Sequence, residues 1–290
     1  MVSVAPGEPF RTTTAHLQAA GVVRHAWVLR LWGRWRRLDR LVHSGDYRFD
    51  QPLSPSEVLA VLRSPTAALH RVTILEGSTL EQIAALLANA GFGAADQFLC
   101  VARDALFLLS VDVPASGLEG YLFPDTYAFA WSTPPERILA TMVERFREQT
   151  AALQTLRLDA GMSEEDMVVL ASLIEKETGV AEERALVSAV FHNRLQIGMP
   201  LQSDPTAMYG RDIHGAPTAA DMAVDSPYNT YLHPGLPPGP ICNPGVASMQ
   251  AALTPVKVPY LYFVARKDGT HLFSRTLEEH NRAVAHFQRH

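Results

Sequence analysis

The chain has 290 residues, of which 47% are hydrophobic and 19% charged, a balance that predicts a globular, soluble protein of one or two domains. The formal net charge of −5 argues against a nucleic-acid binder. The longest apolar run has six residues, whereas a membrane-spanning helix needs about twenty. The two cysteines, Cys100 and Cys242, exclude a disulfide framework and a four-cysteine zinc site, and we do not expect them to pair.

The first notable segment is strongly basic. Residues 24–48 carry seven arginines and two aspartates, and Trp27, Trp32 and Trp35 lie among them. Two interpretations stay open: the solvated basic face of an amphipathic helix, or a surface for anionic lipid headgroups, with nucleic acid less favoured. We expect helices over residues 12–20 and 24–38.

A strand, a turn and a capped helix follow in the next part of the chain. Ser54-Pro55-Ser56-Glu57 starts one helix, and residues 71–75 alternate as a strand does. Ser78-Thr79-Leu80-Glu81 reads as a capping box for a helix that ends at Gly91. This order resembles the LysM-type glycan-binding module, although Leu75 stands where such modules more often have proline or a polar residue. We therefore predict an N-terminal region over residues 1–112, with the LysM-like module at about 70–112.

The rest of the chain is predicted to be mainly helical. We expect helices over residues 135–149, 163–178 and 182–195, a loop-rich region over 199–259, a hairpin of 260–265 with 271–274, and a terminal helix capped by Thr276. The fold class is therefore α+β, in which LysM-like N-terminal modules precede a catalytic domain over residues 113–290 that ends in a β-hairpin and a helix.

The helix over residues 163–178 carries two candidate acids. Met167, Leu170, Ala171 and Ile174 form one apolar stripe, and Glu175 and Glu177 lie on its opposite edges, about 200° apart. The two glutamates therefore cannot form a carboxylate pair that faces one cleft, and periodicity does not choose between them. A carboxyl at the edge of an apolar face is partly desolvated, which raises its pKa and suits a general acid. The simpler interpretation is a surface glutamate paired with an arginine such as Arg184.

The loop-rich region has the chemistry of a sugar-binding surface. Amides and hydroxyls hydrogen-bond sugar hydroxyl and acetamido groups, and aromatic rings stack on sugar rings. The alternative is that these polar side chains only satisfy loop backbone. The candidate side chains are Gln202, Ser203, Asp204, Tyr228, Asn229 and Tyr231.

Other kinds of site have no support in the sequence. There is no GxGxxG that opens a helix, no Walker-type phosphate loop, and no GxSxG motif. The histidines never form HxxxH or HExxH, so we expect no catalytic metal and no cofactor. His233, His271 and His280 are interpreted as structural or exposed.

Several motifs in order resemble the YceG-like family of endolytic murein transglycosylases. The resemblance is close from about Leu118 to the C-terminus and loose before it. The segments that carry it are Leu118-Glu119-Gly120-Tyr121-Leu122-Phe123-Pro124-Asp125-Thr126-Tyr127, Ala171-Ser172-Leu173-Ile174-Glu175-Lys176-Glu177-Thr178, Asn193-Arg194-Leu195, Leu201-Gln202-Ser203-Asp204-Pro205-Thr206, Ser226-Pro227-Tyr228-Asn229-Thr230-Tyr231, Gly235-Leu236-Pro237-Pro238-Gly239-Pro240-Ile241, Tyr262-Phe263-Val264 and His280-Asn281.

The resemblance implies a mechanism with a single acid. It assigns the catalytic acid to the first glutamate of the Glu-Lys-Glu triplet, Glu175, which would act as general acid and then as base. The expected reaction cleaves the β-1,4 bond from N-acetylmuramic acid to N-acetylglucosamine within peptidoglycan strands and leaves 1,6-anhydro ends. The six loop residues above are expected to line the cleft, and Glu119 to hold its wall; a purely structural role for Glu119 stays open as the alternative.

The resemblance also implies a location. Members of the family are anchored in the cytoplasmic membrane by an N-terminal helix and act on the periplasmic side, with cell-wall elongation proteins as expected partners. This chain would then be an ectodomain whose anchoring segment is absent from the sequence. Two rival functions remain, a lysozyme-type muramidase that uses Asp204 as second carboxylate, and a non-catalytic peptidoglycan-binding scaffold.

Overall fold

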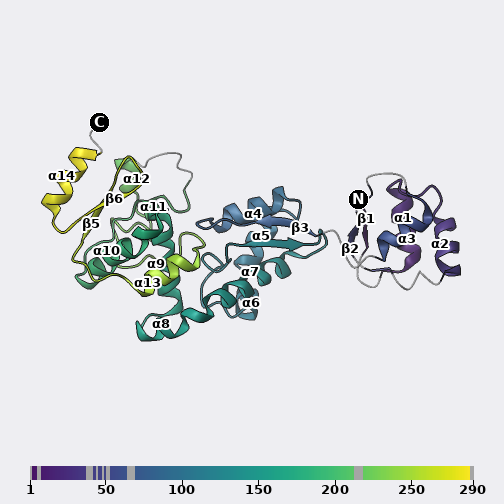
Figure 1. The fold of residues 1–290 in the computed structure, drawn as a ribbon, viewed down its shortest axis with the longest axis horizontal. Coiled ribbons are helices and arrows are strands. Elements are labelled where there is room, and N and C mark those ends of the chain that lie inside the picture. The colour runs from purple at the N-terminus through teal and green to yellow at the C-terminus, as the bar shows by residue number, and fades with distance from the viewer. Residues whose placement is uncertain are drawn as a thin grey trace. The chain divides into compact units, whose positions relative to one another are not determined.

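The structure is a computed structural model that describes residues 2–4, 8–36, 42–43, 45–47, 49, 53–63, 69–211 and 218–287. Within these described residues the fold consists of helices and three separate antiparallel strand pairs, so the α+β class predicted from the sequence is confirmed (Figure 1). The chain forms two compact units. The first comprises Met1–Thr73, Leu86–Ala94 and Thr126–Ile138, and the second Ile74–Ala85, Ala95–Asp125 and Leu139–His290.

The first part of the chain contains two of the strand pairs. Its elements in order are β1 (Val2–Val4), α1 (Phe10–Ala19), α2 (Ala26–Trp35), β2 (Gly45–Tyr47), α3 (Pro55–Leu62), β3 (His70–Thr73), α4 (Leu80–Asn89), α5 (Ala95–Ala102), α6 (Ala105–Ser110) and β4 (Thr126–Phe129). Strand β1 pairs with β2, and β3 pairs with β4.

The remaining elements are mostly helical. They are α7 (Pro135–Thr150), the 3-10 turn η1 (Ala151–Leu153), α8 (Gln154–Asp159), α9 (Glu164–Glu177), the 3-10 turn η2 (Ala181–Glu183), α10 (Arg184–Gln196), α11 (Asp204–Met208), α12 (Ala219–Met222), α13 (Val246–Leu253), β5 (Tyr262–Ala265), β6 (His271–Ser274) and α14 (Leu277–Phe287). The predicted hairpin is present as the antiparallel pair β5 and β6.

A small core holds β1, β2 and the first three helices together. Leu17, Leu29 and Leu59 are fully buried there. The Tyr47 hydroxyl donates to the carbonyls of His43 and Leu62, at 2.6 and 3.0 Å, which ties β2 to the end of α3. The Ser54 capping box at the start of α3 forms as its sequence predicts.

An aromatic cluster packs beside the second strand pair. Phe92 contacts Phe129 and Trp131 with ring centroids 5.9 and 5.2 Å apart. Gly91 has a φ of +90°, and a Cβ there would lie 2.3 Å from the Trp131 ring. Only glycine can therefore end α4 in this place, because it tolerates the positive φ and leaves room for the indole.

The start of α4 differs by one residue from the prediction. Thr79, rather than Ser78, is the capping residue, since its hydroxyl accepts from the Gln82 amide while the Gln82 side chain accepts from the Thr79 amide. The Ser78 hydroxyl instead donates to the Leu75 carbonyl at 2.7 Å. Ser78 therefore stabilises the preceding turn and does not cap the helix.

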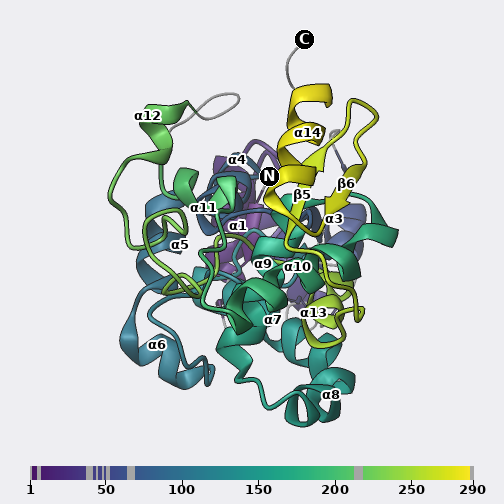
Figure 2. The same cartoon turned by 90° about the vertical axis from the view of Figure 1, so that its left-hand side faces the viewer.

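Helix α9 is the centre of the second unit. Ser163 caps it by accepting from the Asp166 amide at 2.9 Å. Its residues from Met167 to Ile174 are all buried, so the helix is covered on every side rather than along the single predicted stripe. Helices α10 and α13 pack against α9 and against each other (Figure 2).

The loop-rich region over residues 199–259 contains helices that the sequence analysis did not predict. Helix α13 is the important one, because its buried residues cover the second side of α9. Its sequence, Val-Ala-Ser-Met-Gln-Ala-Ala-Leu, is a good helix former. Helix α13 was not predicted because the segments around it are rich in proline and glycine, which are typical of loops. Among the described residues, no helix is long and apolar enough to cross a membrane.

Candidate active site

The two glutamates at the end of α9 have different surroundings. Glu177 lines an open pocket of about 450 Å³, whereas Glu175 is not among the residues that line this pocket. The sequence places the two carboxyls on opposite edges of the helix, and in the structure these two edges face separate environments.

Glu175 is held by the backbone and by one arginine. Its side chain is 7% exposed, and its Oε2 accepts from the amide of Gly245 at 2.9 Å. Gly245 is the capping residue of α13, so the carboxyl lies at the positive end of that helix. The Arg184 Nη2 lies 3.8 Å from its Oε1. The arginine pairing considered from the sequence is thus present, as a long contact.

Glu177 is a partly buried residue with a desolvated carboxyl. The Ser203 hydroxyl donates to its Oε1 at 2.5 Å. The pKa of Glu177 is raised from 4.5 to about 7, mainly by burial; the charge of Asp204 also raises it, while the Ser203 hydrogen bond and Arg194 act in the opposite direction. A carboxyl with this pKa is protonated in a large share of molecules at neutral pH, as a general acid requires.

The loop before α11 and the first residue of that helix bring three of the predicted residues to this pocket. Ser203 reaches Glu177, and Gln202 and Asp204 line the pocket wall. Gln202 has a φ of +51°, a conformation that non-glycine residues rarely adopt and that is found repeatedly at active sites and ligand-binding sites. Its backbone amide is fixed by donation to the Thr230 carbonyl at 3.1 Å.

Asp204 and Tyr231 form a polar pair on the pocket wall. The Tyr231 hydroxyl donates to Asp204 Oδ1 at 2.6 Å, and burial is the main cause that raises the pKa of Tyr231. The pair leaves a carboxylate oxygen and an aromatic ring at the edge of the pocket that Glu177 lines. Such groups can orient a sugar ring and its hydroxyls.

Three further lining residues were not assigned to the site from the sequence. Arg194 is buried and donates to the carbonyls of Leu261 and Leu201, at 2.7 and 2.8 Å. Its guanidinium lies 5.2 Å from the Tyr262 ring, on which the His280 ring also stacks, with centroids 5.2 Å apart. All three lie in segments that carry the family resemblance, which was the one signal that could have identified them.

Glu119 and Tyr228 belong to a second pocket, of about 250 Å³. The Glu119 carboxyl accepts from the Leu80 amide at 3.0 Å, from the Tyr209 hydroxyl at 2.9 Å and from the Asn243 side-chain amide at 2.9 Å. Burial raises its pKa from 4.5 to about 7. Glu119 thus joins three segments of the second unit, and its role in the wall of a glycan cleft stays a prediction.

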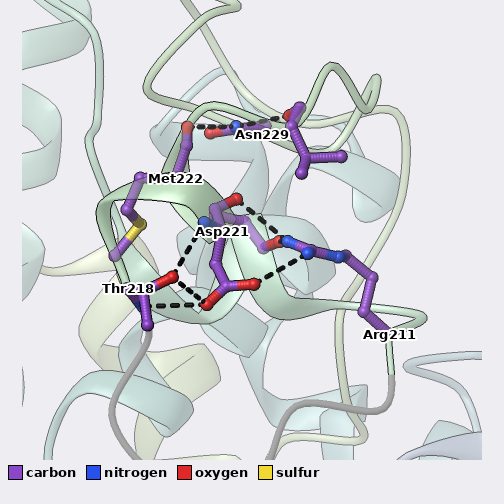
Figure 3. A network of polar contacts seen from close by, with 7 residues as sticks. Arg211, Thr218, Asp221, Met222 and Asn229 are labelled. Carbon is purple, nitrogen blue, oxygen red and sulfur yellow. Dashed lines mark hydrogen bonds and ion pairs between the residues drawn. The ribbon is translucent and has the colours of Figure 1, made fainter.

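Asn229 does not line either of these pockets. It is fully buried, and its side-chain amide donates to the carbonyls of Met222 and Val224, at 2.9 and 2.8 Å. Figure 3 shows it beside the network in which Arg211 pairs with Asp221 at 2.9 Å. Asn229 therefore holds the chain around α12 in place. The predicted loop residues are thus divided between a pocket with Glu177, a pocket with Glu119, and this framework.

The described residues contain no group of three histidine, cysteine, aspartate or glutamate side chains suited to hold a metal ion. Cys100 is exposed and Cys242 is buried, and both are free thiols. Burial raises the pKa of Cys242, so its thiol stays protonated and packs as a small apolar group.

Comparison with known proteins relates this geometry to one family. The model of the YceG-like family matches residues 2–286. An endolytic murein transglycosylase of Bacillus subtilis is 35% identical over 257 residues, which cover 83% of this chain and 71% of that protein. An endolytic murein transglycosylase of Streptococcus pneumoniae is 30% identical, over 98% of this chain and 57% of that protein. The chain thus spans little more than half the length of the pneumococcal relative.

A solved structure agrees with the sequence comparisons. The crystal structure of a yceG-like protein from Listeria monocytogenes superposes with a TM-score of 0.70 at 31% identity, and covers 97% of this chain and 98% of that one. The family resemblance drawn from the motifs is therefore confirmed. The chain belongs to the YceG-like family, with curated relatives that are lytic transglycosylases.

Proposed function

We propose that the chain is an endolytic peptidoglycan lytic transglycosylase that cleaves the β-1,4 bond from N-acetylmuramic acid to N-acetylglucosamine. The names of the curated relatives support the reaction class. The observation that carries the proposal is the pocket of Glu177, where a desolvated carboxyl with a pKa of about 7 lies among hydrogen-bonding and aromatic side chains.

Two glutamates, Glu175 and Glu177, are candidates for the catalytic acid. The assignment to Glu175, made from the resemblance, remains a prediction. The geometry favours Glu177, because it faces the open pocket and has the pKa that proton donation near neutral pH requires. Both carboxylate oxygens of Glu175 already have partners, Gly245 and Arg184. We therefore assign acid and base roles to Glu177 and a positioning role to Glu175, at the start of α13.

The chemistry needs one carboxyl in two protonation states. Protonated Glu177 gives its proton to the bridging oxygen as the bond from C1 of the muramic residue to that oxygen breaks. The resulting carboxylate then takes the proton of the C6 hydroxyl of the same residue, and that oxygen bonds to C1. The glycan is split without water, one end becomes a 1,6-anhydro ring, and Glu177 is protonated again.

The other predicted residues would bind rather than react. Gln202, Asp204 and Tyr231 are proposed to hold the sugar in the pocket of Glu177, with Ser203 fixing the acid itself. Tyr228 is proposed to contact glycan in the second pocket, and Glu119 to hold the wall of that pocket.

A muramidase of the lysozyme type is the second candidate. It is favoured by one observation, the presence of the second carboxyl, Asp204, in the pocket of Glu177. In that mechanism Asp204 would activate water or attack C1, and the product would carry a reducing muramic acid end. A non-catalytic peptidoglycan-binding scaffold is the third, and soluble fragments released from insoluble peptidoglycan would exclude it.

The N-terminal part is proposed to contain the glycan-binding LysM-like module. The order β3, α4, α5 and the antiparallel pairing of β3 with β4 support it, and the closing strand, β4, lies beyond residue 112. The division into regions 1–112 and 113–290 remains a prediction. We further propose that the protein works on the periplasmic side of the cytoplasmic membrane, anchored to that membrane, and meets cell-wall elongation proteins there.

The experiment that tests the proposal compares two isosteric variants. Purified wild type, Glu175→Gln and Glu177→Gln are incubated with peptidoglycan, and the fragments are identified by mass spectrometry. We expect Glu177→Gln to lose activity by a factor of about 100 or more, as expected for removal of a general acid, and Glu175→Gln to retain measurable activity. The exposed Glu182→Gln variant is the matched control.

Each product pattern has a distinct meaning. Fragments lighter by one water than their hydrolysed counterparts support the transglycosylase. Reducing ends would favour the muramidase. If Glu175→Gln is inactive while Glu177→Gln is active, the acid is Glu175, as the resemblance implies.

A further inference from the structure

The short helix α2 exposes an apolar face outside the core that it helps to build. Its inner residues Ala26, Leu29 and Gly33 are buried. Gly33 has to be small, because a Cβ there would lie 2.7 Å from the Phe10 ring. The inner face of α2 is therefore already used for packing within the first unit.

The outer face of α2 carries three large apolar side chains in one row. Trp27 is 60% exposed, Leu31 65% and Trp35 74%. Spacings of four residues place them one above the other along the helix. Proteins rarely expose a contiguous apolar patch of this kind, with two tryptophans, unless it meets a partner or a membrane.

Cations surround this row. The sequence of α2 contains no acidic residue, and Arg24, Arg34 and Arg36 are exposed. The Arg36 guanidinium lies 5.1 Å from the Trp35 ring centroid and 5.4 Å from that of Trp32. A row of tryptophan and leucine bordered by arginines is typical of a helix that lies in a membrane interface and contacts anionic headgroups.

We propose that the outer face of α2 docks on an anionic lipid bilayer, with Trp27, Leu31 and Trp35 inserted at the boundary between headgroups and acyl chains. The arginines keep their charged ends at the phosphates while their alkyl parts cover the apolar row. This contact is independent of the proposed reaction, because the first unit alone supplies it.

The size of the face argues for a lipid rather than a protein partner. A ten-residue helix is about 15 Å long, and three such side chains bury about 600 Å² at most. A stable interface between two proteins needs about 800 Å² on each side. A bilayer has no such requirement, since insertion of a few side chains combines with electrostatic attraction.

Vesicle binding tests the proposal. The chain is sedimented with vesicles of phosphatidylcholine alone and with vesicles that contain phosphatidylglycerol, and tryptophan fluorescence is recorded. We expect binding to the anionic vesicles only, a blue shift of the emission, and weaker binding at high salt. The double variant Trp27→Ser with Trp35→Ser is expected to bind at least tenfold more weakly, and so is the triple variant of Arg24, Arg34 and Arg36 to glutamine.

A matched control removes equally exposed apolar side chains elsewhere. Leu106 and Leu109 of α6 are both 78% exposed, and their change to serine should leave vesicle binding unchanged. Circular dichroism checks that each variant is folded. Equal binding to neutral vesicles, no binding at all, or undiminished binding by the tryptophan variant would overturn the proposal. A dimer of the wild type that the tryptophan variant abolishes would assign the face to self-association instead.

Discussion

The carboxyl of Glu177 illustrates how burial and two neighbouring side chains set the chemistry of one residue. Burial disfavours its charged form, and the nearby Asp204 carboxylate does the same, whereas Ser203 stabilises that form through a hydrogen bond. The result is a pKa of about 7, close to the pH at which a general acid is most useful. Asp204 therefore contributes to the proton affinity of Glu177 through its charge.

This role of Asp204 predicts a shift in the pH profile. Asp204→Asn removes a negative charge but keeps the oxygen that accepts from Tyr231. The pKa of Glu177 should then fall, so the acid loses its proton at lower pH and the alkaline limb of the activity profile moves toward lower pH. The measurement is the initial rate of anhydro-fragment release between pH 5 and 9.

A second aspartate variant serves as the control for this shift. Asp225 is paired with His233 and does not line the pocket, so Asp225→Asn should keep the wild-type profile. Complete loss of activity in Asp204→Asn would contradict a purely electrostatic role, and would favour the muramidase in which Asp204 reacts.

At the scale of elements, the site depends on how segments pack against α9. Gly120 is a close contact of this kind, next to the side chains of Pro240 and of Val168 on α9. A Cβ there would lie 2.6 Å from both side chains. The segment that carries Glu119 can therefore approach α9 only if residue 120 is glycine.

Two glycine variants distinguish the free-energy cost of disrupting this packing from the cost of backbone strain. Gly120 and Gly161 both have positive φ, +86° and +63°, but a Cβ at Gly161 meets nothing within 4 Å. Gly161→Ala should cost about 1–2 kcal/mol of unfolding free energy for the left-handed conformation alone. Gly120→Ala should cost about 1–3 kcal/mol more for the clash. Chemical denaturation measures both, and equal values for the two variants would contradict the packing argument.

At the scale of the whole molecule, two buried carboxyls make stability depend on pH. Burial raises the pKa of both Glu119 and Glu177 from 4.5 to about 7. The folded chain therefore binds these protons more tightly than the unfolded chain. Their contribution to stability is complete below about pH 4.5 and is lost as the pH rises through about 7.

Thermal unfolding at a series of pH values measures this effect. The Tm of the wild type should include a contribution that decreases between pH 5 and 8. The Glu177→Gln variant should show a smaller decrease of Tm over this range, because its glutamine side chain does not titrate. Glu182→Gln, at an exposed position, should leave the slope unchanged. The same slope in all three proteins would show that the Glu177 carboxyl has an ordinary pKa in the folded chain.

Much of the local structure follows from the sequence. The caps at Ser54, Ser163 and Thr276 and the hairpin of β5 and β6 are local signals, and the structure contains each of them. The cap of α4 was misplaced by one residue because Ser78 and Thr79 can both cap, and only the preceding turn decides which one does. Helix α13 was missed because its helix-forming residues lie in a segment rich in proline and glycine.

The sequence by itself determined the family, the α+β class and the separation of Glu175 from Glu177 by about 200° around one helix. These depend on the order and spacing of residues, which are local properties of the chain. Only the tertiary structure decided which carboxyl faces a pocket and which one meets the start of α13. Burial, neighbouring charges and the covering of α9 arise from segments far apart in sequence, and helical periodicity contains no information about them.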